Sequence, residues 1–251
     1  MTNDLRIAFR KLWKSPGFTV TAILTLALGI GANAVVFSVL NAVVLHPVNV
    51  PNAQNLYTLE RFGFPSQSYP DFIDLQNRNR TFERVAAYAI VGPVGVDSGG
   101  SPSTAWPYLA SGNYFDTLGI QPYLGRFYHA SDEKGTNSAP YLVLSYAYWR
   151  GQFHEDAGVV GRTVQINKHQ LTVIGVAPPG FRGTELFFAP AFWIPMVEQP
   201  TIEGYDELVQ RGNHSIFAVG RLKLGVTPAK ATADLNTIGA ALAKTYPTDD
   251  D

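Results

Sequence analysis

The pattern of hydrophobic and polar residues separates a long apolar segment near the N-terminus from a remainder of short apolar stretches and polar turns. The segment runs from Phe18 to Leu45, 28 residues without a charged side chain, whereas a helix that crosses a bilayer needs only about 20. Its 15 Leu, Ile, Val and Phe residues contribute about −5 to −9 kcal/mol to insertion. Asn33 and Asn41 weaken insertion but carry no charge. The pattern therefore predicts one transmembrane helix over residues 18–45.

A cleaved signal peptide has a similar pattern, because a basic start precedes the apolar run and Ala32-Asn33-Ala34 resembles a cleavage site. Cleavage there would leave the 11 further residues of the apolar run, through Leu45, exposed at the start of the mature protein. The continuation of the run beyond Ala34 favours a retained helix.

The first part of the remainder shows strand and helix signals in alternation. Strands are predicted for residues 56–62, 82–96 and 103–109. A helix is predicted to begin at Ser68-Tyr69-Pro70-Asp71, because a serine cap, an early proline and an acidic first turn are typical of helix N-termini. A short helix over 113–118 is predicted to end at Gly119.

From Pro122 to Pro200 the pattern changes to short apolar stretches between glycine, proline and aromatic residues. Alternating residues on both sides of Asn167-Lys168-His169-Gln170 predict a β-hairpin there. A predicted strand over 214–224 and a predicted helix over 227–247 follow. The order of elements predicts an α+β domain that a β-rich segment interrupts.

Charge sets the orientation of the predicted span. The first 14 residues carry a net +3 and the remaining residues −4, which together make the overall −1. Because positive flanks stay in the cytoplasm, residues 46–251 are predicted to be extracytoplasmic, on a bacterial cell inner membrane. Residues 1–17 are either a basic amphipathic helix along the inner leaflet or a disordered basic tail. The residues after the span carry a net negative charge and lack the excess of basic residues that nucleic-acid binding requires, so we expect no nucleic-acid partner.

The polar residues offer no arrangement that supports catalysis. The five histidines lack metal-ligand spacing, cysteine is absent, and His154-Glu155-Asp156 is interpreted as a solvated turn. Gly29-x-Gly31-x-x-Ala34 matches a dinucleotide fingerprint but lies within the predicted span, and Lys244-Thr245 lacks the glycines of a phosphate loop. We therefore expect no enzyme activity, cofactor, metal or ATP site in this chain.

One pattern within the span predicts a contact surface. Small residues recur every three or four positions and make one face along the helix, namely Ala27, Gly31, Ala34, Ser38 and Ala42. In lipid, such faces let helix backbones approach closely and pack. The face predicts a helix that packs against partner helices, although small residues are also simply frequent in membrane helices.

Short motifs along the chain resemble a known family. Near the N-terminus, Pro16-Gly17-Phe18-Thr19 and Leu26-Ala27-Leu28-Gly29-Ile30-Gly31-Ala32-Asn33 resemble the first span of MacB/FtsX-type ABC transporter permeases. In the body, Asn113-Tyr114-Phe115, Gly161-Arg162 and Val173-Ile174-Gly175-Val176-Ala177-Pro178 are similar to the MacB-like periplasmic core domain. The likeness covers nearly the whole chain, and the number and order of the motifs make it fairly specific.

The resemblance implies a non-catalytic permease subunit. In the family, a separate or fused cytoplasmic ABC ATPase drives dimeric permeases, and membrane helices pass the motion to a periplasmic domain for export. The implied partners are the lipid bilayer, a separate ATPase subunit, and a second copy or other permease helices. The implied domain covers residues 46–251. Its porter-like part consists of about 52–121 and 213–247, and a β-rich, sabre-like insertion of about 122–212 separates these two segments.

The sequence departs from the family in one respect. Family members have further membrane helices after the core domain, and no such segment follows Leu45 here. We therefore expect a truncated permease or part of a longer gene product, with the ATPase engaged largely through the missing C-terminal part. The alternative is a single-pass, membrane-anchored periplasmic binding or sensor domain without transport activity.

Overall fold

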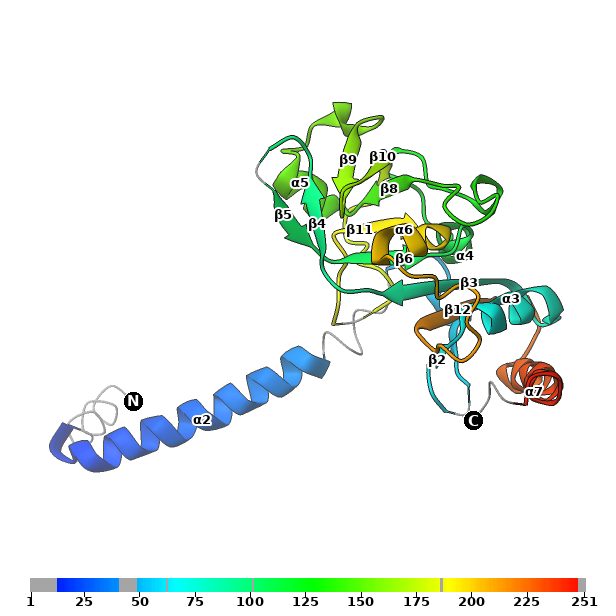
Figure 1. Ribbon diagram of the computed structural model, residues 1–251. Coiled ribbons are helices and arrows are strands. Elements are labelled where there is room, and N and C mark those ends of the chain that lie inside the picture. Colours follow the sequence, from blue (N-terminus) through cyan, green and yellow to red (C-terminus); the bar gives the residue numbers. More distant parts are fainter. Residues whose placement is uncertain (1–12, 41–48, 62, 101, 186, 248–251) are drawn as a thin grey trace. The chain divides into compact units, whose positions relative to one another are not determined.

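The computed structural model describes residues 13–40, 49–61, 63–100, 102–185 and 187–247. The chain divides into two compact units, Met1–Pro47 and Val48–Asp251. The first unit contains the apolar helix α2, and the second contains every strand of the described residues (Figure 1).

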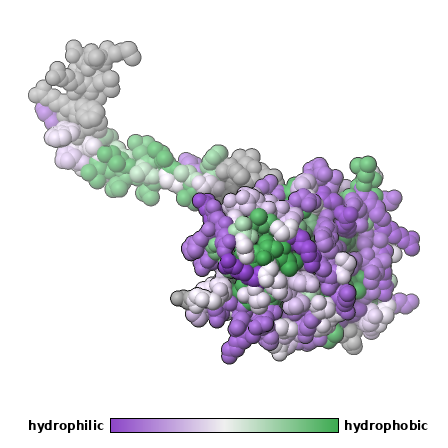
Figure 2. Space-filling view, turned by 90° about the horizontal axis from the view of Figure 1, so that it is seen from above, coloured by the Kyte–Doolittle hydropathy of each residue, from purple (hydrophilic) through white to green (hydrophobic). Residues whose placement is uncertain are grey.

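Helix α2, Pro16–Leu40, is a continuous helix with hydrophobic side chains along its described length (Figure 2). Its polar side chains find partners within the helix: Thr25 Oγ1 donates to the Thr21 carbonyl at 2.9 Å, and Asn33 Nδ2 donates to the Gly29 carbonyl at 3.0 Å. Such bonds matter in lipid, where no water can replace them. The part from Pro16 to Ser38 is long and apolar enough to cross a membrane. The last part of the predicted span, residues 41–45, lies outside the described residues.

The second unit is built on one mixed sheet. In spatial order its strands are β1 (Leu56–Leu59), β12 (Ile216–Leu222), β3 (Phe82–Ile90), β6 (Pro107–Ala110), β11 (Phe192–Pro195), β8 (Tyr141–Leu144), β10 (His169–Val176), β9 (Thr163–Ile166), β4 (Val94–Asp97) and β5 (Ser103–Ala105). Off this path, β2 (Ser66–Gln67) pairs with β12, and β7 (Leu124–Gly125) pairs with β10. The β6–β11 and β8–β10 pairs are parallel.

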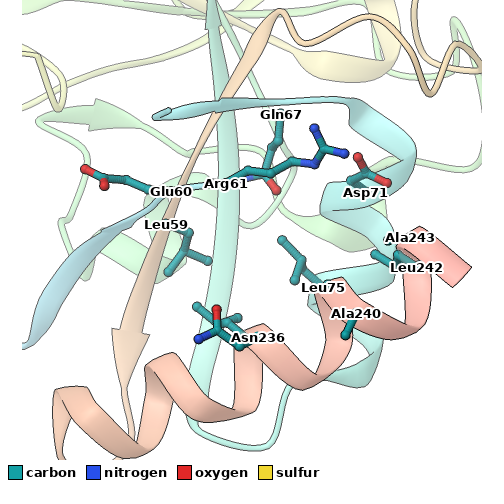
Figure 3. A pocket seen from close by; sticks show the side chains of 12 residues that line it. Leu59, Glu60, Arg61, Gln67, Asp71, Leu75, Asn236, Ala240, Leu242 and Ala243 are labelled. Carbon is teal, nitrogen blue, oxygen red and sulfur yellow. The ribbon is translucent and has the colours of Figure 1, made fainter. Parts of the chain in front are cut away.

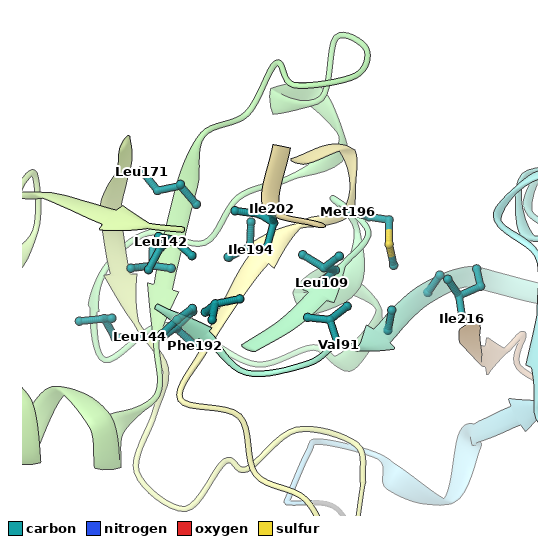
Figure 4. Packing of buried hydrophobic residues seen from close by; sticks show 14 of the residues in the cluster. Val91, Leu109, Leu142, Leu144, Leu171, Phe192, Ile194, Met196, Ile202 and Ile216 are labelled. Carbon is teal, nitrogen blue, oxygen red and sulfur yellow. The ribbon is translucent and has the colours of Figure 1, made fainter. Parts of the chain in front are cut away.

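The central strands β6 and β11 are buried on both faces, whereas β4 and β9 alternate between buried and exposed side chains. Successive side chains of a strand point to opposite sides of the sheet. In β3, Val85 and Ala87 belong to one hydrophobic cluster, whereas Ala86 and Tyr88 belong to the other. Figure 4 shows residues of the first cluster from several strands pointing toward one another. A sheet covered on both faces needs apolar residues at successive positions, which is why the strands read as apolar runs.

Helices cover the two faces unequally. The first face is covered by α3 (Tyr69–Arg78), α5 (Tyr146–Gln152), α6 (Gln199–Glu203) and α7 (Pro228–Thr245), each of which contributes a buried residue to the first cluster. The second cluster receives Phe115 and Leu118 from the short helix α4 (Tyr114–Leu118). Phe115 stacks on Phe127 with ring centroids 3.9 Å apart, so the loop that follows α4 completes this side.

The predicted α+β fold with one N-terminal apolar helix is confirmed, and so are several element ends. The Ser68 hydroxyl accepts from the Asp71 N–H at 3.2 Å at the start of α3. Gly119 ends α4 in the left-handed conformation, with φ of 71°. Asn167 and Lys168 both have positive φ, as the two-residue turn of the β9–β10 hairpin requires.

Two predicted strands are wrong in extent. The strand expected over 82–96 is divided into β3 and β4 around Gly92-Pro93, and proline cannot donate to a neighbouring strand. The strand expected over 103–109 is divided into β5 and β6 at Trp106. These breaks carry β4 and β5 to the far end of the sheet, where Val96 pairs with Ile166. The division into porter-like parts and an insertion beginning near residue 122 stays a prediction.

The contact between β7 and β10 depends on two glycines. Gly125 and Gly175 lie directly opposite each other, and Gly125 has a φ of 65°. A methyl group on Gly175 would overlap the carbonyl oxygen of Arg126, and one on Gly125 would overlap that of Ile174. The absence of both side chains therefore lets the two backbones meet.

We predict that Gly175→Ala destabilises the protein by about 2 kcal/mol or more, because overfilled sites cost about 1–3 kcal/mol even where the backbone can shift. The measurement is urea unfolding of the full chain in detergent micelles. Gly151→Ala in α5 is the matched control, since a methyl group there meets nothing within 4 Å. Equal stability of the two variants would contradict the close-packing account.

Candidate functional site

The residues that follow the membrane segment are held by one side chain, Arg221. Its guanidinium donates to the carbonyl oxygens of Pro51 at 3.0 Å and Asn52 at 3.1 Å. It also donates to the carbonyl oxygens of Thr117 at 2.8 Å and Leu118 at 3.0 Å. One cation thus binds four backbone carbonyls from two segments of the chain, an arrangement that we call the Arg221 clamp.

Local structure explains why these groups meet. Arg221 lies in β12 opposite Leu56, the first residue of β1, so its side chain is close to the chain that leads into β1. Thr117 and Leu118 are in the last turn of α4, where carbonyl groups have no intrahelical donor. The planar guanidinium, with five N–H donors, can serve both segments at once. Displacement of residues 51–52 is therefore resisted by α4 and by the sheet together.

A second feature is an apolar groove between β1, α3 and α7, with a volume of about 390 Å³ (Figure 3). Its lining residues are Leu59, Glu60, Arg61, Gln67, Asp71, Leu75, Leu235, Asn236, Gly239, Ala240, Leu242 and Ala243. Arg61, Gln67 and Asp71 lie toward one end of the groove, Glu60 and Asn236 lie away from them, and leucine and alanine side chains supply most of the apolar lining (Figure 3). The volume lies within the range of small-molecule sites.

Ion pairs fix the helices that form this groove. Arg211 pairs with Asp71 and, at 2.8 Å, with Asp74, both on α3. Its guanidinium also lies 3.9 Å from the ring centroid of Tyr246, directly after α7. Burial lowers the pKa of Arg211, but its hydrogen bonds to Asp74 and Asp71 outweigh this and raise the pKa above its ordinary value. Arg211 therefore stays charged and ties α3 to the end of α7.

The predicted packing face lies on α2. Ala27, Gly31, Ala34 and Ser38 are exposed, and a methyl group on Gly31 would meet nothing within 4 Å. Ala42 lies outside the described residues. The face stays a prediction, because nothing in the described residues packs against it.

The motifs that resembled catalytic or nucleotide sites take structural positions. His154 and Glu155 both have positive φ, and Asp156 accepts from the Gly158 N–H at 2.8 Å, so the trio forms a turn. Lys244-Thr245 ends α7, and Gly29 to Ala34 lie inside α2. Within the described part of the chain, no group of three or more His, Cys, Asp or Glu residues could hold a metal ion.

The sequence did not reveal the Arg221 clamp or the Arg211 ion pairs. Arg221 reaches Pro51 across 170 positions of sequence, and its partners are carbonyl groups, which every residue has. Arg211 lies in a loop 140 positions from Asp71. The alternation of side chains in β12 could have placed Arg221 on one face of the sheet, but it could not have identified the carbonyl groups that Arg221 binds.

Comparison with known proteins identifies the family and structures that share the fold. The MacB-like periplasmic core domain family matches residues 19–238. The structure is similar to the periplasmic region of MacB from Actinobacillus actinomycetemcomitans, with 17% identity, a TM-score of 0.57, and coverage of 78% of this chain and 84% of that chain. No sequence among the curated proteins matches the chain.

Two further solved structures share the fold. A domain of a putative permease protein from Porphyromonas gingivalis has 15% identity and a TM-score of 0.55, with 79% of this chain and 86% of that chain covered. The extracellular domain of the noncanonic ABC-type transporter YknZ from Gram-positive bacteria has 14% identity and a TM-score of 0.55, with 77% and 94% covered. At these identities the likeness concerns the fold.

The second unit is thus a periplasmic-type domain of ABC transporter permeases, a class that is not itself catalytic. The chain belongs to the MacB-like periplasmic core domain family. Together with the apolar helix, this membership indicates a membrane-anchored protein with an extracytoplasmic body and a permease-type role. The family also implies association with an ABC ATPase. We refer to Val48–Asp251 as the ectodomain from this point.

We predict that Arg221→Ala releases both segments of the clamp. Charge-assisted hydrogen bonds contribute about 1.5–3 kcal/mol each where they are well formed, and we expect a loss of about 2–4 kcal/mol for this half-buried group. Arg221→Lys should be intermediate, because an ammonium group has only three donors. Hydrogen exchange of the full chain in detergent should show faster exchange of the amides of 53–59 and 119–121 in both variants.

Lys230→Ala, an exposed substitution in the first turn of α7, is the control and should leave exchange at these amides unchanged. Faster exchange at 53–59 alone, with 119–121 unaffected, would show that the two segments are not held by a common side chain.

Proposed function

We propose that this chain supplies the first membrane helix and the ectodomain of a non-catalytic MacB/FtsX-type permease subunit. It couples ATPase-driven movement of membrane helices to the periplasmic domain for export. The observation that carries the proposal is the Arg221 clamp, because it ties residues 51–52, which follow the membrane segment, to α4 and β12. A displacement that reaches residues 51–52 would thereby pass to α4 and to the sheet.

The proposal includes a location and partners. The basic N-terminal flank supports an N-terminus in the cytoplasm and an ectodomain in the periplasm of a bacterial inner membrane. A separate cytoplasmic ABC ATPase supplies the energy; the association of the family with such ATPases supports this partner. The small-residue face of α2 packs against a second copy or against other permease helices.

One observation favours a second function. The groove between β1, α3 and α7 has the volume of a binding site and a largely apolar lining with a few polar side chains. A single-pass anchored protein that binds or senses a periplasmic ligand through this groove would need no ATPase. The two functions differ in whether the ectodomain responds to ATP turnover.

We predict that the tagged full-length chain, isolated from native membranes, captures an ABC ATPase together with the other permease helices that carry most of the ATPase contact. Vanadate, which arrests ATP turnover, should then change hydrogen exchange of residues 49–59 in the wild type and leave it unchanged in Arg221→Ala. Lys230→Ala should respond as the wild type does. Absence of a captured ATPase would overturn the permease function and leave the single-pass binding function.

We also predict that Gly31→Leu weakens self-association of α2, or its association with other permease helices, by about 1 kcal/mol, because a bulky side chain separates the packed backbones. Gly29→Leu is the matched control: it adds the same volume on the opposite side of the same helix, where a methyl group likewise meets nothing within 4 Å. A two-hybrid reporter in the inner membrane measures both. Equal signals would mean that the small-residue face has no partner.

A further inference from the structure

The loop between β10 and β11 is held firmly on its inner side. Phe181 stacks on Trp193 with ring centroids 5.2 Å apart, and Thr184 shares a hydrogen bond of 3.2 Å with the Tyr114 hydroxyl. The Tyr88 hydroxyl donates to the Glu185 carboxylate. Burial, followed by this bond to Glu185, raises the pKa of Tyr88 far above its ordinary value. The tyrosine therefore remains a donor at every physiological pH.

The outer side of the same loop presents aromatic side chains to solvent. Phe187 is 84% exposed, and Trp106, from the connection between β5 and β6, is 48% exposed. Phe188 lies between them and the core: its ring is stacked 5.5 Å from that of Tyr108 and meets Trp106 edge-on at 5.8 Å. We call Trp106, Phe187 and Phe188 the aromatic tip. Its base is fixed, whereas its end has no cover among the described residues.

The loop that carries the aromatic tip begins beside the first described residues of the ectodomain. A methyl group on Gly180, one residue before Phe181, would lie 3.1 Å from Nδ2 of the Asn49 side chain. Val50 and Phe188 pack against the same hydrophobic cluster. The first described residues of the ectodomain are thus in contact with the start of this loop.

The chain length keeps this region near the bilayer. The predicted span ends at Leu45, four residues before Asn49, and four extended residues reach at most about 14 Å. Even counted from Ser38, where the described membrane-length segment ends, the 11 residues to Asn49 reach at most about 40 Å. Asn49, which meets the start of the loop that carries the aromatic tip, therefore lies within this distance of the end of the span.

We infer that the aromatic tip lies in the interfacial region of the lipid leaflet on the ectodomain side. Tryptophan is enriched at that depth, where its ring is apolar and its N–H stays solvated. Phe187 adds apolar area, and the exposed Arg182 in the same loop suits the phosphate groups of lipids. The contact gives the ectodomain a second support on the membrane besides α2. It rests on the membrane anchoring and not on the proposed coupling to an ATPase.

The chain has no cysteine, so a single cysteine at Phe187→Cys can carry an environment-sensitive fluorophore. The full chain is reconstituted without any ATPase into vesicles of phosphatidylethanolamine and phosphatidylglycerol, with and without lipids that carry a quencher near the headgroup. We expect blue-shifted emission from the label, and quenching several-fold greater than at the control. Because no ATPase is present, a failure here is distinct from a failure of the permease function.

The control is Gln170→Cys, an exposed site at the start of β10. It is roughly 20 Å along this strand from the end that leads to the aromatic tip, at about 3.3 Å per residue. Its label should stay water-like in the same vesicles. Equal, weak quenching at both sites would overturn the inference. Blue-shifted emission at Phe187→Cys that the lipid quencher does not reach would also overturn it, because the tip would then be covered by protein, such as a second copy.

Discussion

The fold depends on the burial of both faces at the centre of a single sheet that contains segments from the whole length of the ectodomain. Its centre is the parallel pairing of β6 with β11, in which Tyr108 is opposite Trp193 and Leu109 is opposite Ile194. All four side chains are fully buried, and they alternate between the two hydrophobic clusters. A shift of register by one residue would exchange these clusters. The register of the central strands is therefore fixed by the packing on both faces.

The fixed position of β12 in this sheet determines what the Arg221 clamp can hold in place. A guanidinium on a mobile loop would move with the residues that it binds, whereas Arg221 belongs to a strand with a neighbour on each side. The clamp thus connects residues 51–52 to an element that cannot be displaced alone. Arg211 plays the corresponding part on the other side of β1, where it holds α3 against the end of α7.

Elements whose ends are set by neighbouring residues could be predicted from the sequence, whereas strand pairing between distant segments could not. Ser68, Gly119 and the Asn167-Lys168 turn act within a few residues of sequence, so their patterns are sufficient to predict them. The breaks at Gly92-Pro93 and Trp106 depend on where β4 and β5 pair, which is decided by β9 about 70 positions away. The apolar runs of a sheet covered on both faces also conceal the alternation that would mark such breaks. The family resemblance supplied the fold, whereas the two arginines that organise the candidate site emerged only from the structure.

Strand β1 is common to the clamp and to the groove. Its first residue, Leu56, is paired with Arg221, and its last residue, Leu59, lines the groove. The opposite walls belong to α3 and α7, which Arg211 fixes to each other rather than to β1. A load on residues 51–52 would therefore act on the same strand that forms one wall of the groove. Coupling to the membrane helix and binding in the groove are therefore compatible tasks, and the short strand between them is the part that would relate one to the other.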